Sequence, residues 1–424
     1  MHRRHFLQTG SALGAMGLIS GCATTGGGSG PKVVVIGGGY SGATAAKYLR
    51  LWSEQKIQVT LVEPNPAFVS CPISNLVIGG SKTIADITTP YDNLTKRHGV
   101  NVVKDRVNSI DADKRIVKLA GGTELSYDRL IVSPGVDFMW ESLPGMNKAG
   151  AKEKVMHAWK AGEQTLTLRK QLEAMPDGGV FAMSIPLAPY RCPPGPYERA
   201  CQVAEYFTKA KPKSKVLILD ANEDVTSKGP LFKKAWAERY KGMIEYRGKH
   251  NVTDVDAATN TLKFEFNDDI KASVLNVIPN MRAGDIAVNA GLATANKRWC
   301  EVDFLTFESK AAKNVHVLGD SIQIAPGMPK SGHMANQHGK TCAAAVVALL
   351  MGKEVNPMPI YNNTCYSFVS SEDVVHVASV HRYDAEKKTM LTVPGSGGVS
   401  SAANELEGRY ALAWARNIWA DTLA

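Results

Sequence analysis

The chain has 424 residues, which is too long for one hydrophobic core and predicts two or three domains. A hydrophobic content of 44% and a charged content of 21% exclude a disordered chain or a small disulfide-dense scaffold. The lysines are scattered, so the net charge of +9 favours a solvated basic surface over a docking patch for an acidic partner, and nucleic acid has little support as a partner.

Residues 1–29 are predicted to be an export signal and a flexible tether. The pair Arg3 and Arg4, followed by a weakly apolar, glycine-interrupted run, is typical of a twin-arginine signal and predicts a periplasmic protein that is exported already folded. The stretch "LISGC" resembles a lipobox, so Cys22 either carries a lipid that tethers the protein to a membrane or lies near a cleavage site without one. No later apolar run reaches the roughly 20 residues that span a bilayer.

A dinucleotide-binding motif follows the tether. "KVVVIGGGYSG" is a β-branched strand that leads into Gly37, Gly39 and Gly42 and then into an alanine-rich helix. "QVTLVE" supplies a second strand, which ends at Glu63. Glycines let the backbone approach a pyrophosphate at a helix N-terminus, and the acid accepts hydrogen bonds from ribose hydroxyls.

Two later segments favour FAD over NAD as the bound dinucleotide. "YDRLIVSPGV" (127–136) is a strand that ends in a tight turn, and "NVHVLGDSI" (314–322) is a strand that ends at Gly319 and Asp320. Both resemble the elements that close the FAD domain in glutathione-reductase-like flavoproteins. The alternative for Asp320 is an ordinary turn at a strand end.

A second Rossmann-like unit is predicted to lack a nicotinamide site. Its first strand lies in "GGVFAMSIPLAP" (178–189) and its second, "SKVLILDAN", ends at Asp220, but "CPPGPYE" between them has no GxGxxG. Prolines lack the N–H groups that a phosphate cradle needs, so we expect neither NADH nor NADPH to be the electron donor. Cys192 should lie just ahead of a helix N-terminus, whose dipole favours a thiolate.

Several motifs together resemble the flavoprotein subunit of flavocytochrome c sulfide dehydrogenase, in the sulfide:quinone oxidoreductase branch of the FAD-dependent disulfide oxidoreductases. They are "HAWKAGEQT", "LRKQLE", "RCPPGPYERA", "MPKSG" and "NTCYS". The resemblance implies that Cys71, in "SCPISNLVIGG", holds FAD covalently, although Pro72 departs from the family pattern. It also implies a redox-active disulfide between Cys192 and Cys365.

The resemblance implies that the protein oxidises sulfide to sulfur or polysulfide through this disulfide. The chain has no CxxCH motif, so haem c is expected only on a partner chain, a c-type cytochrome that takes electrons one at a time. Two alternatives remain: a sulfide:quinone oxidoreductase, and a flavoprotein carrier in a larger sulfur-oxidation system.

The local sequence around the remaining candidate residues predicts their roles. Glu198 is either a proton donor and acceptor for the cysteines or a first-turn helix acid, and Lys330 either stabilises negative charge on reduced flavin or is solvated. Cys201 is expected in the core, although it could compete for Cys192. Cys300 and Cys342 are also expected in the core, and no CxxC or HxxxH spacing indicates a metal site.

The predicted fold is α/β, with glutathione-reductase-like tandem Rossmann-type domains and a C-terminal α+β interface domain. Residues 30–143 and 281–352 would form the FAD domain, 144–280 the second Rossmann-like domain and 353–424 the interface domain. The final helix spaces Trp414 and Ile418 on one face with Leu406 and Tyr410. We expect this face to pack on its own domain in preference to a partner or a membrane surface.

Overall fold

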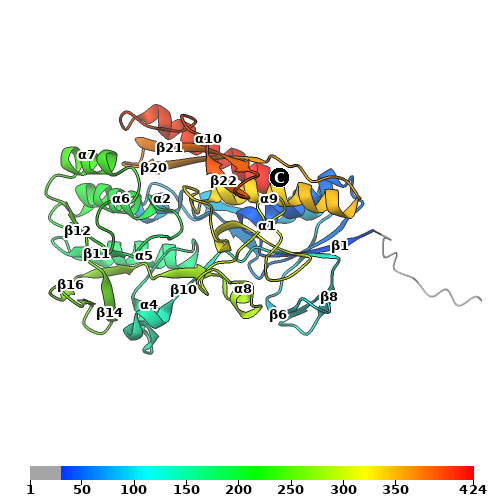
Figure 1. The fold of residues 1–424 in the computed structure, drawn as a ribbon. Coiled ribbons are helices and arrows are strands. Elements are labelled where there is room, and N and C mark those ends of the chain that lie inside the picture. The colour runs from blue at the N-terminus through cyan, green and yellow to red at the C-terminus, as the bar shows by residue number, and fades with distance from the viewer. Residues whose placement is uncertain (1–29) are drawn as a thin grey trace, which may run out of the picture.

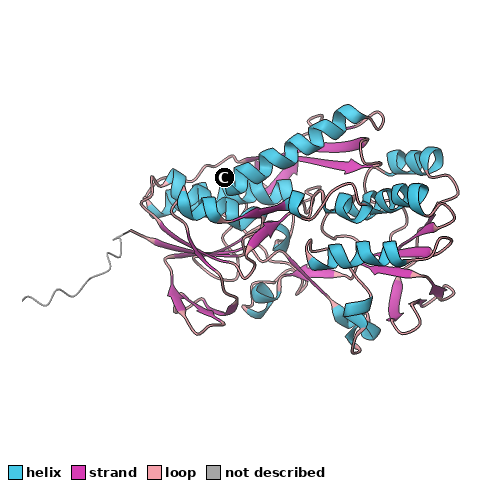
Figure 2. Cartoon of the chain, turned by 180° about the vertical axis from the view of Figure 1, so that it is seen from behind, coloured by secondary structure: helices cyan, strands magenta, loops and turns pink. Residues whose placement is uncertain are grey.

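The computed structural model describes residues 30–424, which form two parallel sheets at opposite ends of the molecule and a third sheet across them (Figure 1, Figure 2). The predicted export signal, with Arg3, Arg4 and Cys22, lies outside the described residues and stays a prediction. Within residues 30–424, no helix combines the length and the apolar character needed to cross a membrane.

The first sheet has the strand order β19-β9-β1-β2-β5, and all its pairs are parallel. Its strands are buried on both faces, which explains their runs of valine, isoleucine and leucine. Helix α1 leads from β1 to β2 and packs against α9. The strands and helices are β1 Lys32–Ile36, β2 Gln58–Val62, β5 Asn101–Val103, β9 Arg129–Val132, β19 Val315–Val317, α1 Tyr40–Trp52 and α9 Gly332–Leu350.

The second sheet is also parallel, in the order β13-β12-β11-β17. Helix α6 connects β11 to β12 and packs against both strands, while α7 connects β12 to β13. The elements are β11 Val180–Ile185, β12 Lys215–Asp220, β13 Ile244–Arg247, β17 Val274–Val277, α5 Glu163–Ala174, α6 Gly195–Ala210 and α7 Gly229–Arg239.

A C-terminal antiparallel sheet lies across the two parallel sheets. Strand β20 contacts both α6 and α9, and the last helix, α10, covers this sheet and reaches α1 (Figure 1). This arrangement brings the middle of β20 to the junction between the two parallel sheets. The elements are β20 Ile360–Phe368, β21 Val374–Asp384, β22 Thr389–Thr392, β23 Gly398–Val399 and α10 Glu405–Leu423.

Short elements join and decorate these sheets. Strands β10 and β18 form an antiparallel pair. In the chain, β10 follows the first sheet's β9 and precedes the second sheet's β11, and β18 follows the second sheet's β17 and precedes the first sheet's β19. The remaining elements are β3 Ala67–Val69, β4 Thr88–Pro90, β6 Val107–Asp111, β7 Ile116–Leu119, β8 Glu124–Ser126, β10 Val136–Phe138, β14 Val252–Asp256, β15 Thr261–Phe264, β16 Ile270–Lys271, β18 Met281–Ala283, α2 Ser74–Gly79, α3 Asp92–Lys96, α4 Ala151–Lys154 and α8 Asp285–Asn289.

The two parallel sheets and the C-terminal sheet with its helix agree with the predicted tandem architecture. The first sheet takes strand β19 from far along the chain, as a FAD domain built from two segments requires. The boundaries at residues 143, 281 and 353 stay predictions. In α10 only part of the predicted face is covered: Ile418 is buried, whereas Leu406 and Tyr410 are exposed.

A buried arginine on α6 ties several of these elements together. The Arg199 guanidinium is 1% exposed and donates to the carbonyls of His157 and Ala158, at 2.9 and 2.6 Å. It also donates to the side-chain oxygens of Asn75 and Asn276, at 3.0 and 2.9 Å. These bonds join α2, α6, β17 and the loop before α5, and they satisfy a charge that burial would otherwise make costly.

Replacing this arginine should therefore destabilise the fold. We expect Arg199→Met to lower the free energy of unfolding by about 3 kcal/mol, because several buried acceptors lose their donor. Urea unfolding followed by circular dichroism measures this change. Arg247→Met is the matched control, since the Arg247 side chain is 40% exposed and, in the described part of the chain, its ion pair is with Glu245 on its own strand. Equal stability of the two variants would contradict the role given to Arg199.

Candidate active site

One large cavity, with a volume of about 1100 Å³, lies where the parallel strands of the first sheet end. Its walls come from the ends of β1, β2 and β9, from the loop that precedes α6, from β20 and from α10. Open α/β sheets bind ligands at the carboxyl ends of their strands. The cavity is therefore the natural place for a dinucleotide.

The glycine turn at one end of the cavity fits the predicted phosphate cradle. Gly37 has φ +94°, and a Cβ on it would lie 2.3 Å from the carbonyl oxygen of Ser133. Gly42 allows α1 to pack closely, because a Cβ there would lie 1.9 Å from the carbonyl oxygen of Gly37. Gly39 has no atom within 4 Å of the position of an added Cβ. The turn is thus tight on its inner side and open toward the cavity.

Glu63 also lies at this end, as predicted. Its Oε2 accepts from the backbone N–H of Gly38 at 2.7 Å, and its Oε1 accepts from the N–H and the side-chain amide of Asn65. The carboxylate is buried, lines the cavity and is held in one orientation by these donors. A ribose hydroxyl is a suitable further donor to it.

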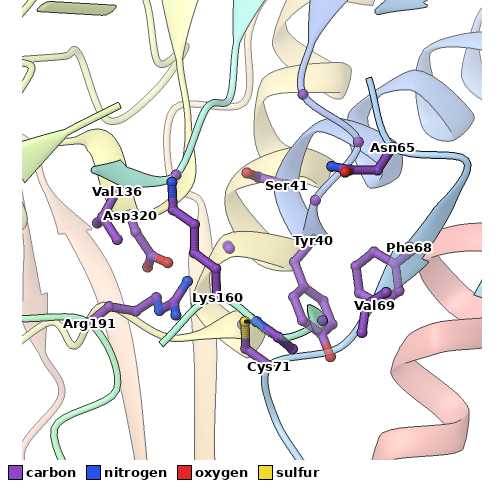
Figure 3. A pocket seen from close by; sticks show the side chains of 18 of the residues that line it. Tyr40, Ser41, Asn65, Phe68, Val69, Cys71, Val136, Lys160, Arg191 and Asp320 are labelled. Atoms are coloured by element: carbon purple, nitrogen blue, oxygen red, sulfur yellow. Dashed lines mark hydrogen bonds between the residues drawn. The ribbon is translucent and has the colours of Figure 1, made fainter. Parts of the chain in front are cut away.

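Charged groups and a thiol surround the middle of the cavity (Figure 3). Burial opposes the charge of Arg191, but the neighbouring Cys71, Asp320 and Cys192 raise its pKa above the ordinary value. Burial raises the pKa of Asp320, and Arg191 opposes that effect. The sulfur of Cys71 accepts from the N–H of Ala161 at 3.4 Å and lines the cavity.

Arg191 was missed in the sequence, although it directly precedes Cys192 in a motif already singled out. Gly319 has φ +69° and packs against Ser41, so it shapes the turn that presents Asp320.

A single cavity thus extends from the glycine turn to the Cys71 thiol, and its residues fit a flavin dinucleotide. Gly37, Gly39 and Glu63 would hold its nucleotide half, and the Arg191, Asp320 and Cys71 group its flavin half.

Cys192 and Cys365 line the same cavity from different parts of the chain. Both are free thiols in this structure, and their pairing stays a prediction. Cys192 has φ +57°, and its N–H donates to the carbonyl of Lys330 at 2.9 Å. The amide of Asn363 donates to the sulfur of Cys365 at 3.8 Å.

The prediction that the helix dipole favours a thiolate at Cys192 does not agree with the surroundings of this thiol. Cys192 does lie just ahead of α6, but burial raises the pKa of its thiol well above the ordinary value, and the nearby Cys365 and Glu198 raise it further. Desolvation of the charged form outweighs the favourable end of the helix dipole.

Glu198 faces this pair from the first turn of α6. Its Oε2 accepts from the amide of Asn75 at 2.7 Å, and its Oε1 accepts from the N–H of Phe368 at 2.8 Å. Burial raises the pKa of the carboxyl, and these two hydrogen bonds oppose the rise. The hydrogen bond to Phe368 also links α6 directly to β20.

Lys330 requires a correction. Its ammonium does not line the cavity but donates to the carbonyls of Asp320 and Ile322, at 2.8 and 2.6 Å, and lies 3.6 Å from the centre of the Trp299 ring. Burial lowers its pKa to about 7. Lys330 therefore stabilises the backbone of the turn that contains Asp320. The next residue, Ser331, caps α9 as predicted.

A second buried lysine was missed. Lys228 precedes α7, and its ammonium donates to the carbonyl of Cys365 at 2.9 Å, to the Ser367 hydroxyl at 2.8 Å and to the carbonyl of Val375 at 3.4 Å. Burial lowers its pKa to about 8. Its sequence context, "TSKGP", has no signal that separates it from a surface lysine.

The second Rossmann-like unit has an acid bonded to an asparagine two residues later, as the first unit does, but its acid is also bonded to two tyrosines. Asp220 Oδ1 accepts from the N–H and the side-chain amide of Asn222, at 2.9 and 2.7 Å. Its Oδ2 accepts from the hydroxyls of Tyr197 and Tyr246, at 2.7 and 3.1 Å. The carboxylate is 0% exposed, so two tyrosines stand where a ribose would bind.

Among residues 30–424, the other three cysteines are buried, as predicted. Cys201, Cys300 and Cys342 are each 0% exposed and belong to the main hydrophobic core.

The comparisons with known proteins agree with this geometry. The model of the pyridine nucleotide-disulphide oxidoreductases matches residues 31–175, that of the central part of the sulfide dehydrogenase [flavocytochrome c] flavoprotein chain residues 165–279, and that of the flavocytochrome c sulphide dehydrogenase flavin-binding region residues 357–423. These matches and the residues of the cavity support FAD as the cofactor.

Individual relatives point the same way. The sulfide dehydrogenase [flavocytochrome c] flavoprotein chain of Chlorobaculum thiosulfatiphilum is 61% identical over 46 residues, which are 11% of this chain and 94% of that one. The mitochondrial sulfide:quinone oxidoreductase of Dictyostelium discoideum is 27% identical over 68% of this chain and 65% of its own length.

The solved sulfide:quinone oxidoreductase of Aquifex aeolicus has a TM-score of 0.74 and 20% identity, over 92% of this chain and 91% of that one. This likeness confirms the predicted fold class. Taken with the family models and the close match to the Chlorobaculum chain, it leads to one assignment: the protein belongs to the flavoprotein family of flavocytochrome c sulfide dehydrogenase.

Proposed function

We propose that this chain oxidises sulfide to sulfur or polysulfide through a disulfide between Cys192 and Cys365 and delivers the electrons to a separate c-type cytochrome. The observation that carries the proposal is that these two cysteines and Glu198 line the cavity that contains Cys71, where Cys192 interacts electrostatically with both Cys365 and Glu198. Family membership supports the same chemistry, because a relative of 61% identity is named as a sulfide dehydrogenase.

The disulfide supplies the electrophile that sulfide oxidation needs. HS⁻ attacks one sulfur, the Cys192–Cys365 bond breaks and a new S–S bond forms, which leaves one cysteine as a persulfide and the other as a thiolate. The single negative charge and all electrons are conserved in this exchange. Bound FAD would supply the two-electron acceptor. The outer sulfur of the persulfide would leave as sulfur or extend a polysulfide, its proton and the two electrons would pass to the acceptor, and Cys192 and Cys365 would rejoin as the disulfide.

Glu198 is suited to handle the protons of this exchange. Burial raises the pKa of its carboxyl above the ordinary value, and its partners Asn75 and Phe368 fix its orientation. The carboxyl lines the cavity beside Cys192, which makes it available to the sulfur atoms.

A cytochrome partner is favoured over a quinone acceptor by the name of the Chlorobaculum chain, which is 61% identical over 46 residues. The likeness to proteins named sulfide:quinone oxidoreductase keeps quinone as the second candidate. We further propose twin-arginine export to the periplasm, with Cys22 as a lipid anchor or as part of a cleaved signal.

The first prediction concerns flavin attachment. If Cys71 forms a thioether to the flavin, the flavin should stay on the polypeptide after acid precipitation, and Cys71→Ser should release it. In-gel fluorescence of the washed precipitate measures this directly. Cys300→Ser is the control, because Cys300 is buried in the core away from the cavity. Flavin that leaves the wild-type chain in acid would refute attachment through Cys71.

A second prediction concerns nicotinamide. We expect NADH and NADPH to bleach the flavin absorbance at a rate far below that of sulfide. The proline-rich loop lacks N–H groups that could donate to a phosphate, and the hydroxyls of two tyrosines already donate to the Asp220 carboxylate. Anaerobic stopped-flow absorbance compares the donors at equal concentration. Rapid bleaching by either nucleotide would point to a dehydrogenase instead.

The third prediction concerns the cysteine pair. Cys192→Ser and Cys365→Ser should each lose at least about 100-fold in sulfide-dependent flavin bleaching, since the serine hydroxyl cannot form the electrophilic S–S bond. Both should remain yellow and reducible by dithionite. Cys201→Ser is the control and should retain activity, because Cys201 is buried in α6. Full activity in Cys365→Ser, or a Cys192–Cys201 link in unreduced peptide maps, would overturn the assignment.

A further inference from the structure

The environment of Lys228 is unusual for a buried ammonium. The side chain is 8% exposed, and within the described part of the chain every hydrogen-bond partner of its nitrogen is a neutral oxygen. Buried charges are normally paired with an opposite charge, because hydrogen bonds to neutral groups do not repay the full desolvation cost. Lys228 therefore has the hydrogen-bond acceptors it needs but, among the described residues, no carboxylate bonded to it.

The groups that interact with this charge belong to the proposed sulfur site. The acids that act on Lys228 are, in decreasing strength, the thiol of Cys365, Glu198 and Cys192, followed by Glu407. They come from β20, the first turn of α6, the preceding loop and α10. On α7 the Phe232 ring lies 6.0 Å away. The strongest of these partners is Cys365, whose own carbonyl Lys228 already binds.

We propose that Lys228 is a positioning residue that holds the negative charge of the reduced cysteine pair on Cys365. The inference rests on the proposed function in taking Cys192 and Cys365 as the reacting pair. The lysine fixes the backbone of Cys365 through its carbonyl, and its ammonium supplies the counter-charge. The amide of Asn363, which donates to the sulfur of Cys365, acts in the same direction.

The electrostatics of the two thiols follow this assignment. Burial raises the pKa of both, but Lys228 and the Asn363 amide oppose the rise at Cys365. At Cys192 the largest effects after burial are the repulsions from Cys365 and Glu198, which raise its pKa further, while Arg191 and Lys228 lower it. Glu198 also raises the pKa of Cys365, but there it ranks after the opposing effects of Lys228 and Asn363. The ammonium is charged below its pKa of about 8, so the advantage of Cys365 exists below that pH and fades above it.

Pulsed alkylation of the reduced protein tests the proposal without using enzyme activity. The purified, flavin-loaded chain is reduced with a phosphine and exposed to iodoacetamide between pH 6 and pH 8, and peptide mass spectrometry measures the alkylation rate of each cysteine. We expect Cys365 to react faster than Cys192. Lys228→Gln should slow Cys365 by about tenfold at pH 7, as a pKa rise of one unit does. Lys228→Arg should keep the faster rate.

The matched control is Lys47→Gln. Lys47 is also buried and donates to two carbonyls, those of Ala420 and Asp421, but it lies away from both cysteines. This variant should leave the alkylation profile of Cys365 unchanged, whatever it does to thermal stability. An equal slowing of Cys365 in the Lys47 variant would mean that lost rigidity, and not lost charge, explains the effect.

A second readout covers the case in which Lys228→Gln folds poorly. In the wild-type chain alone, faster alkylation of Cys192 than of Cys365 below pH 8 would overturn the proposal. Where the variant folds, equilibration with glutathione buffers should show that its disulfide is harder to reduce, and an unchanged midpoint would also overturn it. Unreduced peptide maps without a Cys192–Cys365 link would refute the proposed function instead, so the two failures are distinguishable.

Discussion

The active site depends on the contact between β20 and the N-terminal end of α6. The proposed disulfide requires Cys192 and Cys365, which come from distant parts of the chain, to lie with Cα atoms about 4.4 to 6.8 Å apart. The hydrogen bond from the N–H of Phe368 to Glu198 crosses this contact, and the bond from Lys228 to the carbonyl of Cys365 joins the N-terminal end of α7 to the same strand. Each joins a group with acid or base character to the backbone of β20. The same few bonds therefore hold the C-terminal sheet in place and set the electrostatics of the sulfur site.

The two Rossmann-like units illustrate how one local design serves two ends. In each, an acid at the end of the second strand is held by an asparagine two residues later: Glu63 by Asn65, and Asp220 by Asn222. In the first unit the acid faces the cavity beside an open glycine turn. In the second, the hydroxyls of Tyr197 and Tyr246 donate to the acid, and the loop before α6 carries Cys192 in place of a phosphate cradle. In the proposed function, the position that a nicotinamide enzyme gives to its electron donor is taken by the sulfur chemistry of Cys192.

Local features of the fold could be predicted from the sequence, because short-range chemistry determines them. The strand, glycine turn and acid of the first unit fix a dinucleotide site within about thirty residues, and the Ser331 cap of α9 is equally local. The lysines could not be predicted in this way. Lys330 turns away from the cavity and Lys228 turns inward, and both directions depend on packing between segments far apart in the chain. The pKa of Cys192 was misjudged for the same reason, since the helix dipole is visible in the sequence but the depth of burial is not.

The central claim is that a flavin and a cysteine pair in this cavity oxidise sulfide and pass electrons to a cytochrome. The most direct test is an anaerobic absorbance titration of the purified chain with sulfide, followed by oxidised cytochrome c in one cell and a quinone analogue in another. Sulfide should bleach the flavin band at a catalytically useful rate, and cytochrome c should restore the band in preference to the quinone. A flavin band that sulfide leaves unchanged would exclude sulfide oxidation by this chain, and a band that only the quinone restores would exclude cytochrome c as the acceptor.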